Sequence, residues 1–184
     1  AQVAPPSDDT PEVALTGEVG GLLAQFYYMT TTPRSTLEIM NFPSADMSRV
    51  DESIDYPASN TTYIGVLQQD NLAIMWTGGL RITIPGVYTF TLTSDDGSIL
   101  KIDGEEVLNN DGTHGMETVT GTHDLEEGDH PLVVLYIKGS GEAGITFKYS
   151  GPDTDGATVI VPCSVLVLPE GVERPFKVTD MVSA

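Results

Sequence analysis

Short stretches in which apolar and polar residues alternate run along much of the chain. In the stretch 88–93, tyrosine, phenylalanine and leucine alternate with three threonines, and the stretch 145–149 alternates in the same way. A period of two is typical of β-strands that bury one face. The stretch 132–137 is apolar at every position, which indicates a central strand covered on both faces.

Further apolar runs at 21–29, 62–67, 72–77 and 98–102 are also predicted to be strands. From residue 30 to residue 59 the chain is irregular, because Pro33, Pro43 and Pro57 prevent a long helix. A short helical turn is compatible with the stretch 45–50. Many short strands separated by glycine-rich turns predict an all-β fold, an antiparallel β-sandwich or barrel.

Two adjacent carboxylates, Asp95 and Asp96, follow the strand 88–93 in the turn sequence Ser-Asp-Asp-Gly. On a regular strand, neighbouring side chains point to opposite faces, so both acids can hold one cation only if the backbone is bent, twisted or cis between them. Oxygen ligands of this kind suit calcium better than zinc. A solvated acidic turn is the alternative interpretation, and these residues alone leave both open.

Several motifs along the chain together resemble one known family, the domain first recognised in anthrax protective antigen and often called the PA fourteen domain. They cover residues 21 to 168 approximately and occur in the family's order. In chain order they are Gly21-Leu22-Leu23-Ala24-Gln25-Phe26-Tyr27, Ile54-Asp55-Tyr56, Trp76-Thr77-Gly78, Gly86-Val87-Tyr88-Thr89-Phe90, Ser94-Asp95-Asp96-Gly97, Leu100, Ile102-Asp103-Gly104, Val107, His114, Leu125-Glu126-Glu127-Gly128 and Ile145-Thr146-Phe147-Lys148-Tyr149.

The resemblance implies an antiparallel β-sandwich or barrel of the protective-antigen type. In the family's lectin branch, found in yeast flocculins and bacterial surface adhesins, an Asp-Asp pair joined by a cis peptide binds calcium. A second loop completes that site, and the ion holds vicinal hydroxyls of a sugar. Asp95 and Asp96 match this pair, so the resemblance favours a calcium site here.

The stretch 138–144, rich in glycine, lies where the family has its second loop. The flocculin-like branch uses an asparagine ligand in this loop, and the stretch 138–144 contains no asparagine. Either Glu142 replaces it, or the carbonyl groups of Lys138 and Ser140 coordinate the ion; an ordinary glycine-rich hairpin is the alternative. The expected calcium ligands are Asp95, Asp96, Lys138, Ser140 and Glu142. The expected sugar-binding residues are Asp95, Asp96, Gly139, Ser140, Gly141 and Glu142.

Composition restricts the partners. Lys and Arg total 8 against 27 Asp and Glu, a formal net charge of −19. Such a charge repels nucleic acid and anionic membranes, and no stretch of roughly 20 apolar residues indicates a membrane span. The single cysteine, Cys163, lies in an apolar run and is predicted to be buried. A calcium-rich exterior, at the cell surface, is the expected location.

Domain organisation and function follow from these patterns. Residues 1–18 read as a linker, 19–168 as the β-sandwich lectin domain, and 169–184 as a closing strand or a linker to a next module. We expect a monomeric module within a larger chain that binds carbohydrate on cell surfaces or polysaccharide through Ca²⁺. Catalysis is not expected, because a shared cation keeps Asp95 and Asp96 ionised and unavailable as a general acid. The alternative function is a structural spacer or protein-interaction module stabilised by calcium.

Overall fold

The computed structural model describes residues 11–59 and 66–173 of the 184-residue chain. The regular elements of this part are thirteen strands and two short 3₁₀ helices. They are β1 (Leu15–Val19), β2 (Leu22–Tyr28), η1 (Thr36–Asn41), β3 (Met47–Asp51), β4 (Asp55–Ser59), β5 (Leu72–Ile82), β6 (Gly86–Asp95), β7 (Ser98–Ile102), β8 (Glu105–Asn110), β9 (Glu117–Leu125), β10 (Gly128–Lys138), β11 (Ala143–Ser150), η2 (Pro152–Thr154), β12 (Val159–Ile160) and β13 (Leu166–Pro169).

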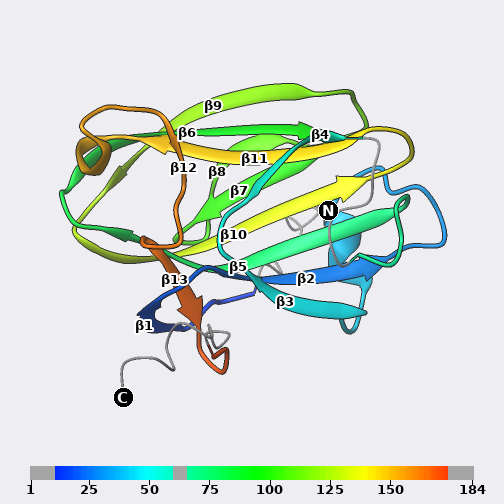
Figure 1. Cartoon of the computed structure of the whole chain (residues 1–184), viewed down its shortest axis with the longest axis horizontal. Helices are drawn as coiled ribbons and strands as arrows, with labels where there is room; N and C mark the ends of the chain where they lie inside the picture. The colour runs from blue at the N-terminus through cyan, green and yellow to red at the C-terminus, as the bar shows by residue number, and fades with distance from the viewer. Residues whose placement is uncertain (1–10, 60–65, 174–184) are drawn as a thin grey trace, which may run out of the picture.

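These strands form two antiparallel sheets that face each other (Figure 1). The larger sheet has eight strands in the order β1-β13-β5-β10-β7-β8, with β2 paired to β5 and β3 paired to β2. The smaller sheet has five strands in the order β12-β11-β6-β9, with β4 paired to β11. The structure therefore confirms the prediction of an all-β antiparallel sandwich. Neither short helix in the described part of the chain has the length and apolarity needed to cross a bilayer.

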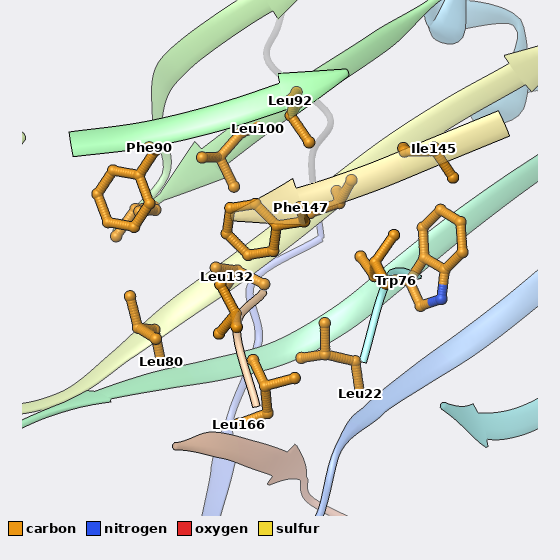
Figure 2. Close-up of a cluster of buried hydrophobic side chains, with 14 of the residues drawn as sticks. Leu22, Trp76, Leu80, Phe90, Leu92, Leu100, Leu132, Ile145, Phe147 and Leu166 are labelled. Atoms are coloured by element: carbon orange, nitrogen blue, oxygen red, sulfur yellow. The ribbon is translucent and has the colours of Figure 1, made fainter. Parts of the chain in front are cut away.

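The main core fills the space between the two sheets (Figure 2). Phe90 and Phe147 come from the smaller sheet, and their stacked rings lie 6.2 Å apart. Trp76 and Leu132 come from the larger sheet, and all four side chains are fully buried. The alternating pattern of β6 explains this arrangement, because every second side chain enters the core and the threonines face outward.

Strand β10 is central in the larger sheet, between β5 and β7. Its residues Leu132, Val134 and Tyr136 belong to the main core, and the intervening positions belong to a second buried cluster on the opposite face of the sheet. Helix η1 contributes Ile39 to that second cluster. The prediction of a strand covered on both faces is thus confirmed, and β10 pairs with β5 up to its last residue.

Some local expectations differ from the structure. Strand β1 begins at Leu15, inside the expected linker 1–18, and pairs with β13, so the ordered sheet begins before residue 19. The stretch 45–50 is not helical, because residues 47–50 belong to β3 and pair with β2. Cys163 is partly exposed rather than buried, because it lies in the turn before β13. Of the predicted strand 62–67, residues 62–65 lie outside the described part.

The end of the sandwich where β10 begins carries two charged contacts. Arg81 and Asp129 form an ion pair with Nε–Oδ1 at 2.7 Å. The His130 ring lies between the carboxylate of Asp103, at 2.7 Å from Nδ1, and the carbonyl of Glu126, at 2.9 Å from Nε2. Burial by itself lowers the pKa of His130, but the Glu126 carbonyl and the Asp103 carboxylate outweigh it, so the pKa is raised. These groups lie at the opposite end of β10 from the site described next.

Candidate functional site

The two adjacent acids lie where the chain crosses from one sheet to the other. Strand β6 of the smaller sheet ends at Asp95, and β7 of the larger sheet begins at Ser98. The peptide bond between Asp95 and Asp96 is cis. Strands β6 and β10 both run toward the right of Figure 1, where the β10–β11 connection also lies. The strand register confirms that the end of β6 lies next to the β10–β11 connection, because Asp95 pairs with Gly144 near the start of β11.

Asp96 is 8% exposed, and its carboxylate is held by two other loops. Its Oδ1 accepts a hydrogen bond of 3.1 Å from the backbone N–H of His114, in the β8–β9 connection. Its Oδ2 accepts one of 2.7 Å from the backbone N–H of Gly139, in the β10–β11 connection. The structure thus brings the Asp pair and the expected second loop together. Each carboxylate oxygen of Asp96 keeps a further lone pair, since one such oxygen can accept more than one bond.

Asp95 is positioned through its main chain. Its carbonyl accepts a hydrogen bond of 2.7 Å from the Tyr136 hydroxyl, and Tyr136 is fully buried. The Asp95 side chain is partly exposed. Burial raises the pKa of this carboxyl, and the charges of Asp96 and Glu142 raise it further, against smaller opposing effects of His114 and Lys138. Negative charge therefore accumulates around Asp95, which is an environment that favours a cation.

Buried polar groups support the turn from beneath. Ser94 and Ser98 share a hydrogen bond of 2.7 Å between their hydroxyls, and the Asn110 amide donates to the Ser94 hydroxyl at 3.0 Å. Gly97 leaves no room for a side chain, because a Cβ there would lie 2.7 Å from the backbone of Gly112. The β8–β9 connection consequently packs directly against the Asp pair.

The residues of the second loop take different positions. Gly139 is buried, and its carbonyl accepts a hydrogen bond of 2.9 Å from the Asn71 N–H. Ser140, Gly141 and Glu142 are exposed around the site. Lys138 is only 1% exposed, and its ammonium pairs with Asp70 at 2.6 Å.

The Lys138 side chain therefore belongs to the support of the loop and adds no donor atom to the site. A role for its carbonyl as a ligand stays a prediction. The same holds for the roles of Ser140 and Glu142 as ligands and for the sugar contacts of the loop.

The β2–η1 connection, which the sequence did not indicate, also borders the site. Asp111 accepts hydrogen bonds from the Ser35 hydroxyl at 2.6 Å and from the Thr36 N–H at 2.7 Å. Thr32 is so close to Gly139 that a Cβ on the glycine would lie 2.8 Å from the Thr32 methyl. Three connections therefore surround the Asp pair. The β2–η1 connection could have been assigned to the site only from a sign of contact between residues 75 positions apart, such as Thr36 and Asp111.

His114 contributes its backbone rather than its ring. The ring Nδ1 lies 2.8 Å from the Gly115 carbonyl, and Nε2 lies 2.9 Å from the Asn110 carbonyl. Burial lowers the pKa of His114, but these two carbonyl acceptors, together with nearby carboxylates, outweigh it and raise the pKa. The ring thus fastens the β8–β9 connection.

The donor set of the site fits a hard cation. Two carboxylates adjoin a buried glycine loop, and a Cβ at Gly139 would lie 3.3 Å from Asp96 Oδ2. Among the described residues, no group of three or more His, Cys, Asp or Glu side chains is arranged to hold a metal. An ion bound by Asp95 and Asp96 would accordingly need carbonyl or water oxygens for its other positions, which is ordinary for calcium and foreign to a structural zinc site.

Comparisons with known proteins agree with this architecture. The PA14 domain family model matches residues 19–161. A structure of an anti-sigma factor domain-containing protein has a TM-score of 0.69 at 20% identity, covering 84% of this chain and 50% of that chain. This chain thus spans half the length of that relative. A comparison with curated protein sequences gives no match.

Two further solved structures come from adhesins. The PA14 sugar-binding domain from an RTX adhesin has a TM-score of 0.71 at 20% identity, covering 82% of this chain and 99% of that chain. The epithelial adhesin 9 A domain from Candida glabrata, in complex with Galβ1-3GlcNAc, has a TM-score of 0.63 at 13% identity, covering 88% of this chain and 97% of that chain. At these identities the likeness establishes the fold.

Proposed function

Because the chain belongs to the PA14 domain family, we propose that it is a calcium-dependent carbohydrate-binding module of a cell-surface adhesin. Solved structures of similar fold include a sugar-binding adhesin domain and an adhesin domain in complex with a galactosyl disaccharide. Fold alone does not assign function, so the proposal depends on the residues of the site.

One observation carries the proposal: Asp96 holds two loops together while its neighbour remains available. The Asp96 carboxylate bonds the N–H groups of His114 and Gly139. The Asp95 main chain is held by the Tyr136 hydroxyl and by its pairing with Gly144, and Asp95 presents a partly exposed carboxylate beside Asp96. The arrangement is a preorganised oxygen cradle that opens to solvent, and preorganisation reduces the free energy lost on binding.

Each group of residues at the site would have a different role. Asp95 and Asp96 would hold the ion, and the backbone of the second loop would complete its coordination. Bound calcium supplies a Lewis-acidic centre at which two adjacent sugar hydroxyls replace water. The exposed residues Ser140, Gly141 and Glu142 would contact the sugar, because they border the same opening.

Single-site affinity should be low under this proposal. Each hydroxyl that replaces a bound water is nearly an even exchange of oxygen ligands. Tight adhesion would then require several copies of the module on one chain or one cell, because linked sites raise the effective concentration.

The test is binding of the purified domain to a panel of immobilised glycans, with calcium and again with a chelator. Asp95→Asn is the informative variant, because in the described part of the chain the Asp95 side chain makes no hydrogen bond to the loops, whereas Asp96→Ala would also release two backbone N–H groups. Asp124→Asn is the matched control, since Asp124 is exposed and pairs with Val87 at the other end of β6. We expect binding to vanish with chelator and in Asp95→Asn, and to persist in Asp124→Asn.

Two results would contradict the proposal. Glycan binding that survives both the chelator and Asp95→Asn would show a sugar site without calcium. Calcium that raises the melting temperature, in a domain that binds no glycan on the panel, would favour a structural spacer or protein-interaction module.

A further inference from the structure

An exposed methionine lies beside the Asp pair. Met116 belongs to the β8–β9 connection and is 38% exposed. It immediately precedes Glu117, which pairs with Ser94 of β6. When this register is continued by one residue, Met116 stands opposite Asp95, the last residue of β6. The β8–β9 connection thus places an apolar side chain next to the partly exposed acid.

The Met116 side chain reaches across β6 toward β11. Strand β6 lies between β9 and β11 (Figure 1), and a Cβ on Gly144 of β11 would lie 3.0 Å from the Met116 Cε methyl. Gly144 pairs with Asp95, and residues directly opposite each other in an antiparallel pair direct their Cβ positions to the same face of the sheet. The Met116 methyl therefore lies on the face to which Asp95 directs its side chain.

A second exposed residue adjoins this methyl. The Cβ position of Gly144 is also 3.0 Å from the backbone of Ala58 in β4, and Ala58 is exposed. Met116 and Ala58 together form a small apolar surface, the apolar platform, at the rim of the acid pair. Filling the room above Gly144 would account for the Met116 methyl, but it leaves the exposed remainder of the side chain without a role.

A pyranose ring offers a surface that matches the platform. Its hydroxyl groups extend around the ring, and the C–H groups between them form an apolar face. A ring whose two adjacent hydroxyls are held at an ion on the Asp pair brings these C–H groups close to the same ion. Methionine adapts to irregular surfaces because its side chain is flexible and polarizable. A hard cation prefers oxygen ligands to a thioether, so the Met116 side chain stays available to the sugar.

We propose that Met116 packs against the C–H face of a bound pyranose and that the site thereby selects cyclic sugars over open-chain polyols. This inference rests on the proposed function and adds the class of ligand and the residue that recognises it. An alditol offers the same adjacent hydroxyls to the ion, but its chain has no fixed C–H face. The ion would therefore bind both kinds of ligand, and the apolar platform would distinguish them.

The size of the effect follows from the area of contact. Each methylene-sized group that is buried raises affinity by about fourfold. Contact with one or two C–H groups predicts that Met116→Ala weakens pyranoside binding by about four- to fifteenfold. The affinity of the matching alditol should change by less than about twofold, because it buries less apolar surface.

The experiment uses competition against the glycan that binds most tightly in the panel, at saturating calcium. The competitors are the methyl glycosides of galactose, glucose and mannose, each beside its alditol. Met116→Leu keeps an apolar side chain and should retain the preference for pyranosides, whereas Met116→Ala should lose most of it. Val159→Ala is the matched control, since Val159 is 40% exposed and pairs with Tyr149 near the other end of β11.

Calorimetric titration with calcium alone distinguishes contact with the sugar from support of the site. Met116→Ala should bind calcium as tightly as wild type, because its thioether is not a ligand. A loss of calcium affinity that accompanies the loss of sugar affinity would show that Met116 only holds the strands around Gly144 in place, and it would overturn the inference.

The remaining outcomes separate this inference from the proposed function. Calcium-dependent glycan binding without a preference for pyranosides over alditols overturns the role of the platform and leaves the lectin function standing. Equal losses for pyranoside and alditol in Met116→Ala, or no loss for either, also overturn it. Absence of calcium-dependent binding to every glycan on the panel overturns the proposed function itself, and this inference with it.

Discussion

The ion pair between Lys138 and Asp70 offers a sharp test of how the site is held in place. The Lys138 ammonium lies 2.6 Å from Asp70 Oδ1 and 3.4 Å from the carbonyl of Gly139. The same carbonyl accepts the Asn71 N–H, and the Gly139 N–H binds Asp96. Lys138 therefore supports the peptide group that follows Gly139, and Asp96 holds the peptide group that precedes it. Removing the ion pair should affect calcium binding although neither side chain is proposed to bind the ion.

The perturbation is Asp70→Asn. It leaves the ammonium of Lys138, 1% exposed, without its carboxylate, but the Asp70 side chain is itself 52% exposed, so water screens part of the loss. Removing one partner of a fully buried pair costs about 3–5 kcal/mol, and a surface pair is worth about 0–1 kcal/mol. A half-buried pair should lie between these limits, so we expect a loss of about 1–3 kcal/mol in the free energy of unfolding. For a domain of this size that lowers the melting temperature by about 2–12 °C.

The assays are urea denaturation without calcium and calorimetric calcium titration. Asp70→Asn should lose stability and bind calcium more weakly, because the loop loosens and a positive charge near the site is no longer neutralised. The double variant Lys138→Met/Asp70→Asn should recover part of the stability and part of the calcium affinity, since removing the two partners together leaves no buried charge. Asp129→Asn, which breaks the distant pair with Arg81, should cost stability without changing calcium affinity. Additive losses in the double variant, or unchanged calcium affinity in Asp70→Asn, would refute the reasoning.

Two further predictions concern Gly139 and His130. Gly139→Ala should lower calcium affinity by at least about tenfold in calorimetric titration, because its Cβ would lie 2.8 Å from the Thr32 methyl and 3.3 Å from Asp96 Oδ2. Adding Thr32→Ser to this variant should restore part of the affinity. An unchanged calcium affinity in Gly139→Ala would show that the loop does not bind the ion. The raised pKa of His130 means that its contact with Asp103 stabilises the fold fully below about pH 6.5 and loses this effect as pH rises through the folded-state pKa. In urea denaturation from pH 6 to 9, the free energies of unfolding of wild type and His130→Gln should therefore converge at high pH. A difference in free energy that stays constant over this range would contradict the prediction.

Local sequence patterns were sufficient to predict the sandwich and the candidate turn. Threonines alternate with apolar residues in β6 because one face of this strand is buried, and β10 is continuously apolar because both of its faces are buried. Which faces are buried is determined by the position of the strand relative to the core. The acid pair was visible because Asp95 and Asp96 are neighbours in the chain. A resemblance in several ordered motifs then favoured a family, and the family model agrees.

The support of the site could not be predicted in the same way. The carbonyl of Lys138 was expected among the calcium ligands, but the sequence did not show that the Lys138 side chain turns to Asp70, which is 68 positions away along the chain. The contact between Asp111 and Thr36 spans 75 positions. Such contacts depend on how two sheets bring their connections together, and no periodicity in a single stretch records that. Polar residues in loops also have no preferred face, so their direction is decided by partners that arrive from elsewhere.

The position of the site explains why its geometry should depend on the core. Strand β6 belongs to the smaller sheet and β7 to the larger one, and the β8–β9 and β10–β11 connections also pass between the sheets. The cradle around Asp96 therefore spans the gap between two layers. Tyr136, which holds the Asp95 carbonyl, packs against Trp76 with ring centroids 6.3 Å apart. A close-packed core resists changes in sheet spacing, so the same aromatic residues that stabilise the sandwich also keep the two acids in position for a cation.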